Sequence, residues 1–202
     1  MIDWLSTFII FFSVIDPIGT VPVFISVTSG RELRDKRRIA FQAAWVSALV
    51  LLFFIVLGEL ILDGIGIPIS AFQIAGGIVL FLFALTMLFG ESKPDKEIGL
   101  KRDSKEVAIF PLAMPSIASP GSMLAAVLLT KNAEHELWEQ VQIAGCMLLV
   151  LGVTYGMMML AAQIYRVIGS GGASILSRVM GLILASIAAT NVLEGIKEYF
   201  QL

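Results

Sequence analysis

The sequence predicts an all-α integral membrane protein. Six transmembrane helices are expected to form two inverted three-helix repeats, with the first and fourth helices broken. The first observation is composition: 57% of the 202 residues are hydrophobic and 15% are charged, whereas soluble domains are about 45–50% apolar and about 25% charged. The second is six apolar runs long enough to cross a bilayer. The third is a pair of prolines at the same spacing in each half.

Six apolar runs divide the chain, and the segments between them are short. A helix needs roughly 20 mostly apolar residues to span the hydrocarbon core. The runs cover about 2–26, 39–62, 69–90, 107–130, 138–165 and 174–196, and a glycine-rich turn at 169–172 precedes the last one. We expect a first three-helix repeat at 1–90, a loop at 91–106 and a second three-helix repeat at 107–202. This division leaves no room for a soluble domain.

The basic residues of the loops predict the orientation. Twelve of the fourteen Lys and Arg residues fall on one side of the six spans, after spans one and three and around the turn before span six. Only Lys131 and Lys197 fall on the other side. Loops rich in Lys and Arg stay in the cytoplasm. We therefore expect both termini outside the cytoplasm, on the periplasmic side, and the 91–106 loop inside it.

The two halves of the chain share features at regular offsets. An offset of 98 superposes Pro17 and Pro22 of the first span on Pro115 and Pro120 of the fourth. An offset of 104 superposes Gly77-Ile78-Val79-Leu80 and Thr86 on Gly181-Leu182-Ile183-Leu184 and Thr190. Each half holds three spans, an odd number, so the halves should insert in opposite orientations. Inverted repeats with a broken helix in each half are typical of secondary transporters.

Residues 12–26 combine an acid, a glycine and two prolines inside an apolar span. Proline removes a backbone donor, and a free backbone group in hydrocarbon costs several kcal/mol unless protein or water satisfies it. We therefore expect a broken helix that lines a polar cavity. Asp16-Pro17 and Ser119-Pro120 both resemble an N-cap followed by proline at the first helical position. Helix N-termini suit a carboxylate, freed carbonyls suit an ammonium or a small cation, and a zwitterion could use both.

Asp16 is the candidate with the strongest physical argument. An ionised carboxylate near the bilayer centre costs about 2.5–3.5 kcal/mol on insertion scales. We interpret Asp16 as a partner for a substrate ammonium, or as a protonation or cation site that couples transport. The alternative is an N-cap that holds the broken helix and touches no substrate. At the offset of 98, Met114 takes its place in the second half, so the charge is not duplicated and one substrate would bind in one orientation.

The candidate site residues gather around the two broken spans. The substrate-binding candidates are Ser13, Asp16, Pro17, Gly19, Thr20, Pro22, Pro115, Ser116, Ser119, Pro120, Gly121 and Ser122, and Asp16 is also the candidate for ion coupling. A second tier holds Thr86, Thr190 and Asn191. Two ordinary explanations stay open: small residues let membrane helices pack closely, and a hydroxyl group can bond to its own backbone.

Several kinds of chemistry lack the residues they need. The one cysteine, Cys146, and the one histidine, His135, cannot form a Cys/His metal site. An intramembrane enzyme would need a nucleophile with a base, so no catalytic residue is predicted. No nucleotide-binding signature such as a Walker A motif occurs in the loops, so ATP is not expected to drive the protein, and no cofactor is expected. The net charge of −2 argues against nucleic acid as a partner.

Two stretches carry a family resemblance. Residues 16–24 (Asp-Pro-Ile-Gly-Thr-Val-Pro-Val-Phe) and 111–115 (Pro-Leu-Ala-Met-Pro, followed by Ser119-Pro120-Gly121) resemble the two signatures of the MarC family of bacterial inner-membrane proteins. Family members often have glycine where this chain has Ser119. The resemblance covers the whole chain and implies a multi-pass small-molecule transporter of the bacterial inner membrane. Some members are described as carriers of glycine and alanine, and the family is similar to the LysE-type exporter superfamily.

The leading hypothesis is a secondary transporter of a small polar solute, a small neutral amino acid above all, with coupling to protons or sodium through Asp16. A passive channel for small polar solutes would have a similar sequence, whereas a non-transporting scaffold has no need of a water-accessible cavity. The expected partners are an amino acid-like substrate and the lipid bilayer. The sequence leaves open the exact substrate, the direction of transport, the coupling ion, the side to which the cavity opens and the oligomeric state, a homo-oligomer included.

Overall fold

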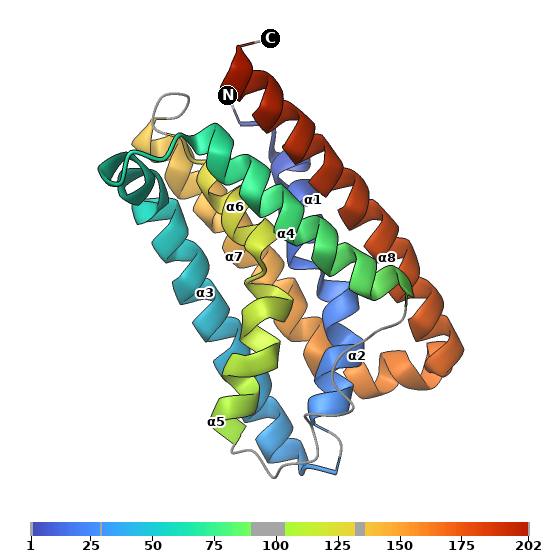
Figure 1. Ribbon diagram of the computed structural model, residues 1–202. Helices are drawn as coiled ribbons and strands as arrows, with labels where there is room; N and C mark the ends of the chain where they lie inside the picture. Colours follow the sequence, from blue (N-terminus) through green and yellow to red (C-terminus); the bar gives the residue numbers. More distant parts are fainter. Residues whose placement is uncertain (1, 29, 90–103, 132–135, 202) are drawn as a thin grey trace.

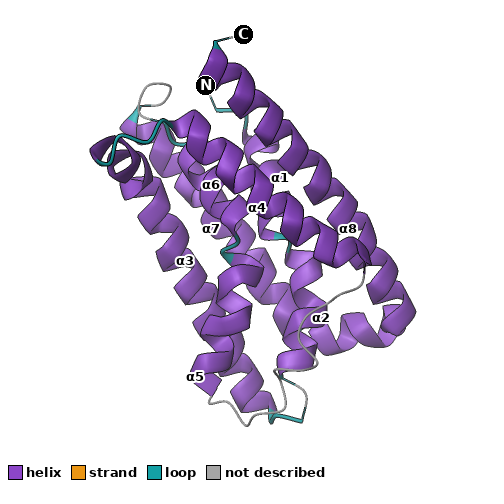
Figure 2. Cartoon of the chain, in the orientation of Figure 1, coloured by secondary structure: helices purple, strands orange, loops and turns teal. Residues whose placement is uncertain are grey.

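The computed structural model describes residues 2–28, 30–89, 104–131 and 136–201. Within these ranges the chain forms helices and no strand (Figure 2). The elements in order are α1 (Trp4–Ile15), α2 (Pro17–Val27), α3 (Leu33–Gly64), α4 (Ile69–Phe89), α5 (Ser104–Val107), the π-helix η1 (Ala108–Ile117), α6 (Pro120–Leu128), α7 (Leu137–Met159) and α8 (Ala161–Phe200). The predicted all-α class is confirmed.

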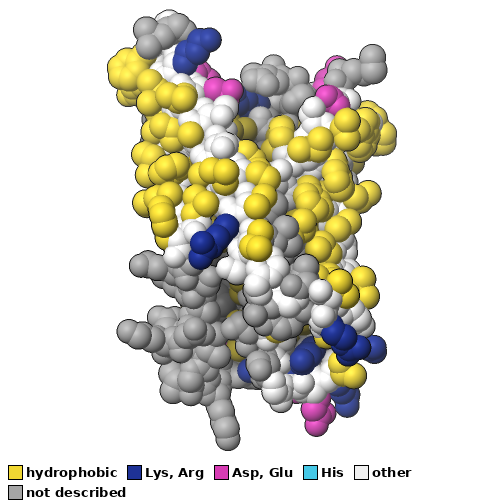
Figure 3. Space-filling view, turned by 90° about the vertical axis from the view of Figure 1, so that its right-hand side faces the viewer, with side chains coloured by type: hydrophobic (Ala, Val, Ile, Leu, Met, Phe, Trp, Pro, Cys, Tyr) yellow, Lys and Arg dark blue, Asp and Glu magenta, His cyan; other side chains and the backbone are white. Residues whose placement is uncertain are grey.

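The surface and the helix lengths are those of a membrane protein. Within the described residues, four segments are long and apolar enough to cross a bilayer: Trp4–Val21, Leu33–Gly64, Ile69–Phe89 and Leu137–Met159. Large apolar side chains face outward along them, among them Trp45 and Leu60, which are 58% and 66% exposed. Hydrophobic side chains cover most of the described middle of one face, and charged groups gather mainly toward its two ends (Figure 3). A surface of this kind is stable against lipid and not against water.

The two remaining predicted spans have a different form. The segment expected at 107–130 is divided among η1 and α6, with α5 before them. The segment expected at 174–196 lies within the 40-residue α8, which bends at Gly169, where φ is 63°. One predicted boundary is wrong, because the helix expected to end at 165 ends at Met159. The turn expected at 169–172 lies at Gly169, where the backbone leaves the helical region and α8 changes direction. Most of the predicted 91–106 loop lies outside the described residues, and α5 already begins at Ser104.

Two helices are broken near the middle of the bundle, as predicted. The first break lies at Asp16, between α1 and α2, and the second lies at Ala118 and Ser119, between η1 and α6. After the first break the chain continues toward the lower end of the bundle in Figure 1, and after the second it continues toward the upper end. The N-termini of α2 and α6 therefore meet in the interior and point in opposite directions.

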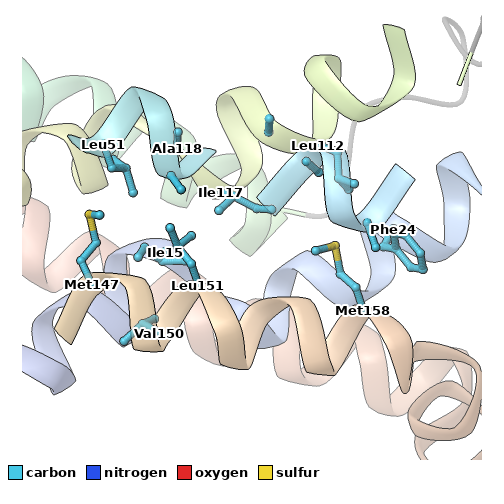
Figure 4. Close-up of a cluster of buried hydrophobic side chains, with 14 of the residues drawn as sticks. Ile15, Phe24, Leu51, Leu112, Ile117, Ala118, Met147, Val150, Leu151 and Met158 are labelled. Carbon is cyan, nitrogen blue, oxygen red and sulfur yellow. The ribbon is translucent and has the colours of Figure 1, made fainter. Parts of the chain in front are cut away.

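Most of the buried apolar side chains that the structure describes belong to one of two clusters. The larger one joins α1, α2, α3, η1, α6 and α7, and Figure 4 shows part of it, with Ile15 of α1 and Ile117 of η1 close to Leu151 of α7. The smaller cluster belongs to α4 and α8 and consists of Leu80, Ala84, Leu184, Ala185 and Ala188. The pair formed by α4 and α8 thus has a core of its own beside the core that holds both breaks.

Glycines let α4 and α8 approach backbone to backbone. A Cβ atom on Gly77 would lie 3.0 Å from the carbonyl oxygen of Ala188, and a Cβ atom on Gly181 would lie 3.0 Å from that of Ala84. These two contacts are related by the offset of 104, because Gly77 then corresponds to Gly181 and Ala84 to Ala188. Small residues at such crossings are a usual means of packing helices in membranes.

Both chain termini lie at the same end of the bundle (Figure 1). At the opposite end the guanidinium Nη1 of Arg31, just before α3, donates to the hydroxyl of Ser104 at the start of α5, with 3.0 Å between the atoms. At the terminal end, Lys131 and Glu198 of α8 approach to 4.0 Å. These contacts connect the ends of the broken segments to neighbouring parts of the chain.

Candidate functional site

Asp16 makes the first break by ending one helix and beginning the next. Its backbone is left-handed, with φ 50° and ψ 68°, and its N–H donates to the carbonyl of Phe12 at the end of α1. Left-handed backbone is rare outside glycine, but aspartate is among the residues that tolerate it. Its carboxylate oxygen Oδ1 then accepts from the N–H of Gly19 at 2.8 Å, and its carbonyl accepts from the N–H of Thr20 at 3.0 Å. Asp16 is therefore the N-cap of α2, as predicted.

Gly19 leaves room for the carboxylate of Asp16, because glycine has no Cβ atom. A Cβ atom at this position would overlap Oδ2 of Asp16 and would lie 2.7 Å from its Cγ. The carboxylate consequently lies against the first turn of α2, in the space that any other residue at position 19 would fill. Asp16 is only 4% exposed there. A buried acid in a span of a membrane protein is costly and points to function.

Ser119 makes the second break in the same way. Its backbone is extended, with φ −75° and ψ 161°, and its hydroxyl oxygen accepts from the N–H of Ser122 at 3.1 Å. Pro120 follows as the first residue of α6, where its missing N–H costs nothing. The hydroxyl of Ser122 donates back to the carbonyls of Ser119 and Ile117, at 2.9 Å and 3.0 Å. The predicted N-cap at Ser119 is confirmed.

The two caps correspond at an offset of 103 and not at the offset of 98 that superposes the proline pairs. In each break the N-cap side chain accepts from the N–H three residues on, and proline is the first helical residue. Asp16 therefore matches Ser119, and the interpretation that placed Met114 opposite Asp16 is wrong. Met114 lies inside η1 with extended backbone, φ −130° and ψ 127°. Both breaks have a polar cap, acidic in the first half and neutral in the second.

A hydrogen bond joins the two breaks directly. The hydroxyl of Ser119 donates to the carbonyl of Val14 in the last turn of α1, with 3.2 Å between the oxygens. Carbonyls in the last turn of a helix have no partner within that helix. Because a new helix, α2, begins at Pro17, the carbonyl of Val14 needs a donor from another part of the chain. The hydroxyl of Ser119 at the second break is that donor. The two breaks thus form one continuous polar centre.

Some polar groups of this centre have no hydrogen-bond partner within the described residues. Among them are the N–H of Ile18, the N–H of Gly121 and Oδ2 of Asp16, whose other oxygen is the one that binds Gly19. Ile18 and Gly121 are each the second residue of their helix, and the offset of 103 relates them as it relates the caps. An unpaired N–H inside a bilayer costs several kcal/mol unless water or a ligand satisfies it. The centre therefore has donors for an anion beside an acceptor for a cation.

The segment before the second break is a π-helix. The N–H of Ala118 donates to the carbonyl of Ala113, five residues back, at 2.8 Å, and the hydroxyl of Ser47 on α3 reaches the same carbonyl at 3.4 Å. Phe110 and Met114, which precede the two prolines of this segment, have extended backbone, as residues before proline prefer. Ser47 is buried and was missed by sequence reasoning, because a lone serine in an apolar span carries no signal of its own.

The other predicted residues are not all at the centre. Thr20 is buried and its hydroxyl bonds to the carbonyl of Asp16. Ser13, Ser116 and Pro120 are partly buried beside the breaks, and Pro17 is buried. Thr190 is exposed and bonds to the carbonyl of Ser186 in its own helix, which is the ordinary explanation considered above. Asn191 is partly buried on α8. The side chains of Pro22, Thr86 and Pro115 lie outside those that the structure describes.

In the described part of the chain, no group of three or more His, Cys, Asp or Glu side chains comes together. Around the two breaks the available groups are one carboxylate, serine and threonine hydroxyls, and backbone N–H groups. Groups of this kind offer hydrogen-bond donors and acceptors, which suit a small charged or zwitterionic molecule.

Comparison with known proteins identifies the family. The profile described as MarC family integral membrane protein matches residues 2–200. The chain belongs to the MarC family. The predicted family is thereby confirmed, and with it the character of the chain as a membrane protein.

Relatives of this MarC chain occur in bacteria and archaea. A UPF0056 membrane protein from Methanocaldococcus jannaschii is 36% identical over 92% of both chains. A UPF0056 membrane protein from Aquifex aeolicus is 31% identical over 98% of this chain and 97% of its own. The UPF0056 inner membrane protein YhgN from Escherichia coli is 31% identical over the full length of both. No solved structure matches the chain.

Proposed function

We propose that this MarC protein is a secondary transporter of a small neutral amino acid, bound at the centre where the two breaks meet. One observation carries the proposal: the Ser119–Val14 hydrogen bond joins two breaks whose following helices point in opposite directions. Each of these helices has one unpaired N–H in its first turn, and the first break also holds a buried carboxylate. Unsatisfied groups of this kind persist in a membrane where a solute or water completes them.

The two breaks differ in charge, and this difference orients the solute. Asp16 places a negative charge at the N-terminus of α2, so the positive end of that helix dipole is already compensated. Ser119 is neutral, so the N-terminus of α6 keeps its attraction for an anion. The solute carboxylate accordingly binds the N–H of Gly121, and its ammonium binds Oδ2 of Asp16. The site is assigned to binding and not to catalysis.

An inverted repeat of six spans supports transport by alternating access. Two relations favour this architecture: the caps correspond at an offset of 103, and the glycine contacts between α4 and α8 correspond at 104. With three spans in each half, the repeats oppose one another in the membrane. The opposed directions of α2 and α6 are in keeping with this arrangement.

The protein is placed in the inner membrane with both termini periplasmic. The location rests on the printed name of its relative YhgN, an inner membrane protein. The orientation rests on the excess of Lys and Arg in the loops after spans one and three. Both termini lie at one end of the bundle, in keeping with an even number of spans.

Transport of labelled glycine and alanine into proteoliposomes tests the proposal. The purified protein is expected to accumulate label above the outside concentration when a proton or a sodium gradient is imposed, and the gradient that drives accumulation identifies the coupling ion. Preloading with unlabelled alanine should accelerate the entry of label by exchange. Uptake that only equilibrates, without saturation or exchange, would instead identify a passive channel.

A further inference from the structure

Leu80 of α4 lies directly on the first turn of α6, at the second break. Leu80 is fully buried and belongs to the separate cluster of α4 and α8. A Cβ atom on Gly121 would lie 2.6 Å from its Cδ1 and 2.8 Å from its Cδ2. The Leu80 side chain fills the space that a Cβ atom on residue 121 would occupy, which explains the glycine at this position. Leu80 thus packs against the backbone of Gly121, whose N–H is unpaired.

A second contact fixes the position of Leu80. One turn earlier on α4, Gly76 faces Leu124 of α6, and a Cβ atom on Gly76 would lie 3.1 Å from Cδ2 of Leu124. A leucine of each helix thus lies against a glycine of the other, at two successive levels. This interlocking leaves α4 little freedom to slide along α6, so the Leu80 side chain stays over the N-terminal turn of α6.

We propose that Leu80 sets the upper size of the solute side chain. The inference rests on the proposed function, in which the solute carboxylate binds the N–H of Gly121. With the carboxylate there, the substituent on the α-carbon of the solute has to share the space around Gly121 with the two methyl groups of Leu80. Glycine and alanine place a hydrogen or a methyl group against Leu80, whereas valine and leucine bring branched groups into the same volume.

Competition against labelled glycine uptake tests the inference, with unlabelled alanine, valine and leucine as competitors. In the native protein alanine is expected to compete well and valine poorly. Leu80→Ala vacates the volume of an isopropyl group, so valine should compete at least about 10-fold better, the discrimination that one or two methylene-sized groups provide in an apolar pocket. Alanine should compete about as before.

Leu184→Ala is the matched control, because Leu184 is equally buried in the same cluster but belongs to α8. It should leave the ratio of valine to alanine competition unchanged. An unchanged ratio in Leu80→Ala, or the same shift in both variants, would overturn the inference. If the native protein takes up no glycine at all, it is the proposed function that fails.

A pair of variants tests the underlying contact without transport. Gly121→Ala places a methyl group into the Leu80 side chain and should lower the melting temperature in detergent, whereas Gly121→Ala combined with Leu80→Ala should recover part of that loss. Strictly additive losses in the double variant would show that the two residues do not share this space and would overturn the assignment of Leu80.

Discussion

The hydroxyl of Ser119 donates to the carbonyl of Val14, 105 positions away in the sequence, and so joins the two broken helices. The same hydroxyl accepts from the N–H of Ser122 at the start of α6. One side chain therefore caps its own helix and satisfies the last turn of another.

Replacing Ser119 with alanine should destabilise the fold. The change removes an N-cap, worth about 1 kcal/mol, and leaves the buried carbonyl of Val14 without a donor, at about 1–3 kcal/mol. The measurement is thermal unfolding in detergent. Ser186→Ala is the control, because the exposed hydroxyl of Ser186 bonds only to the carbonyl of Leu182 in its own helix. Equal melting temperatures for the two variants would contradict the role given to Ser119.

Gly19→Ala should abolish uptake while the protein remains folded. The added Cβ would overlap Oδ2 of Asp16, so the carboxylate has to leave the first turn of α2. Gly145→Ala is the matched control, because a Cβ atom on Gly145, in α7, would meet nothing within 4 Å. Uptake and the elution profile on size exclusion are compared for both variants. Native uptake in Gly19→Ala would show that the position of the carboxylate is unimportant.

Gly181→Ala should weaken the pairing of α4 and α8. Its Cβ would lie 3.0 Å from the carbonyl oxygen of Ala84, a backbone atom that cannot turn away. Overpacking of this kind typically costs about 1–3 kcal/mol, and thermal unfolding in detergent measures the loss. Gly156→Ala serves as the control, since a Cβ atom there would meet nothing within 4 Å. If the 104 offset reflects a real symmetry, Gly77→Ala should cost about as much as Gly181→Ala.

The helical class, both breaks and both N-caps could be predicted from the sequence. Asp-Pro and Ser-Pro inside an apolar run indicate an N-cap followed by proline at the first position of a new helix. Sequence reasoning matched the two broken spans at the wrong offset, because the prolines of the two spans have different roles. Pro17 and Pro120 begin helices, whereas Pro22 lies within α2 and Pro115 within η1. Proline spacing alone does not distinguish these roles.

Other features could not be predicted from the sequence. The π-helical segment exists because the carbonyl of Ala113 pairs with the N–H of Ala118 five residues on, and nothing in an apolar run distinguishes that pairing from the usual one. The contact of Leu80 with Gly121 depends on how α4 meets α6.

The central claim is that the Asp16 carboxylate takes part in transport and does not only cap a helix. Gradient-driven uptake of labelled glycine by the native protein, Asp16→Asn and Asp3→Asn tests it most directly. Asp3 is the matched control, because it also caps a helix, accepting from the N–H groups of Leu5 and Ser6 at an exposed terminus. Asparagine can still cap a helix, so both variants should fold. Accumulation lost in Asp16→Asn and kept in Asp3→Asn is the predicted result, and native accumulation in Asp16→Asn would contradict the claim.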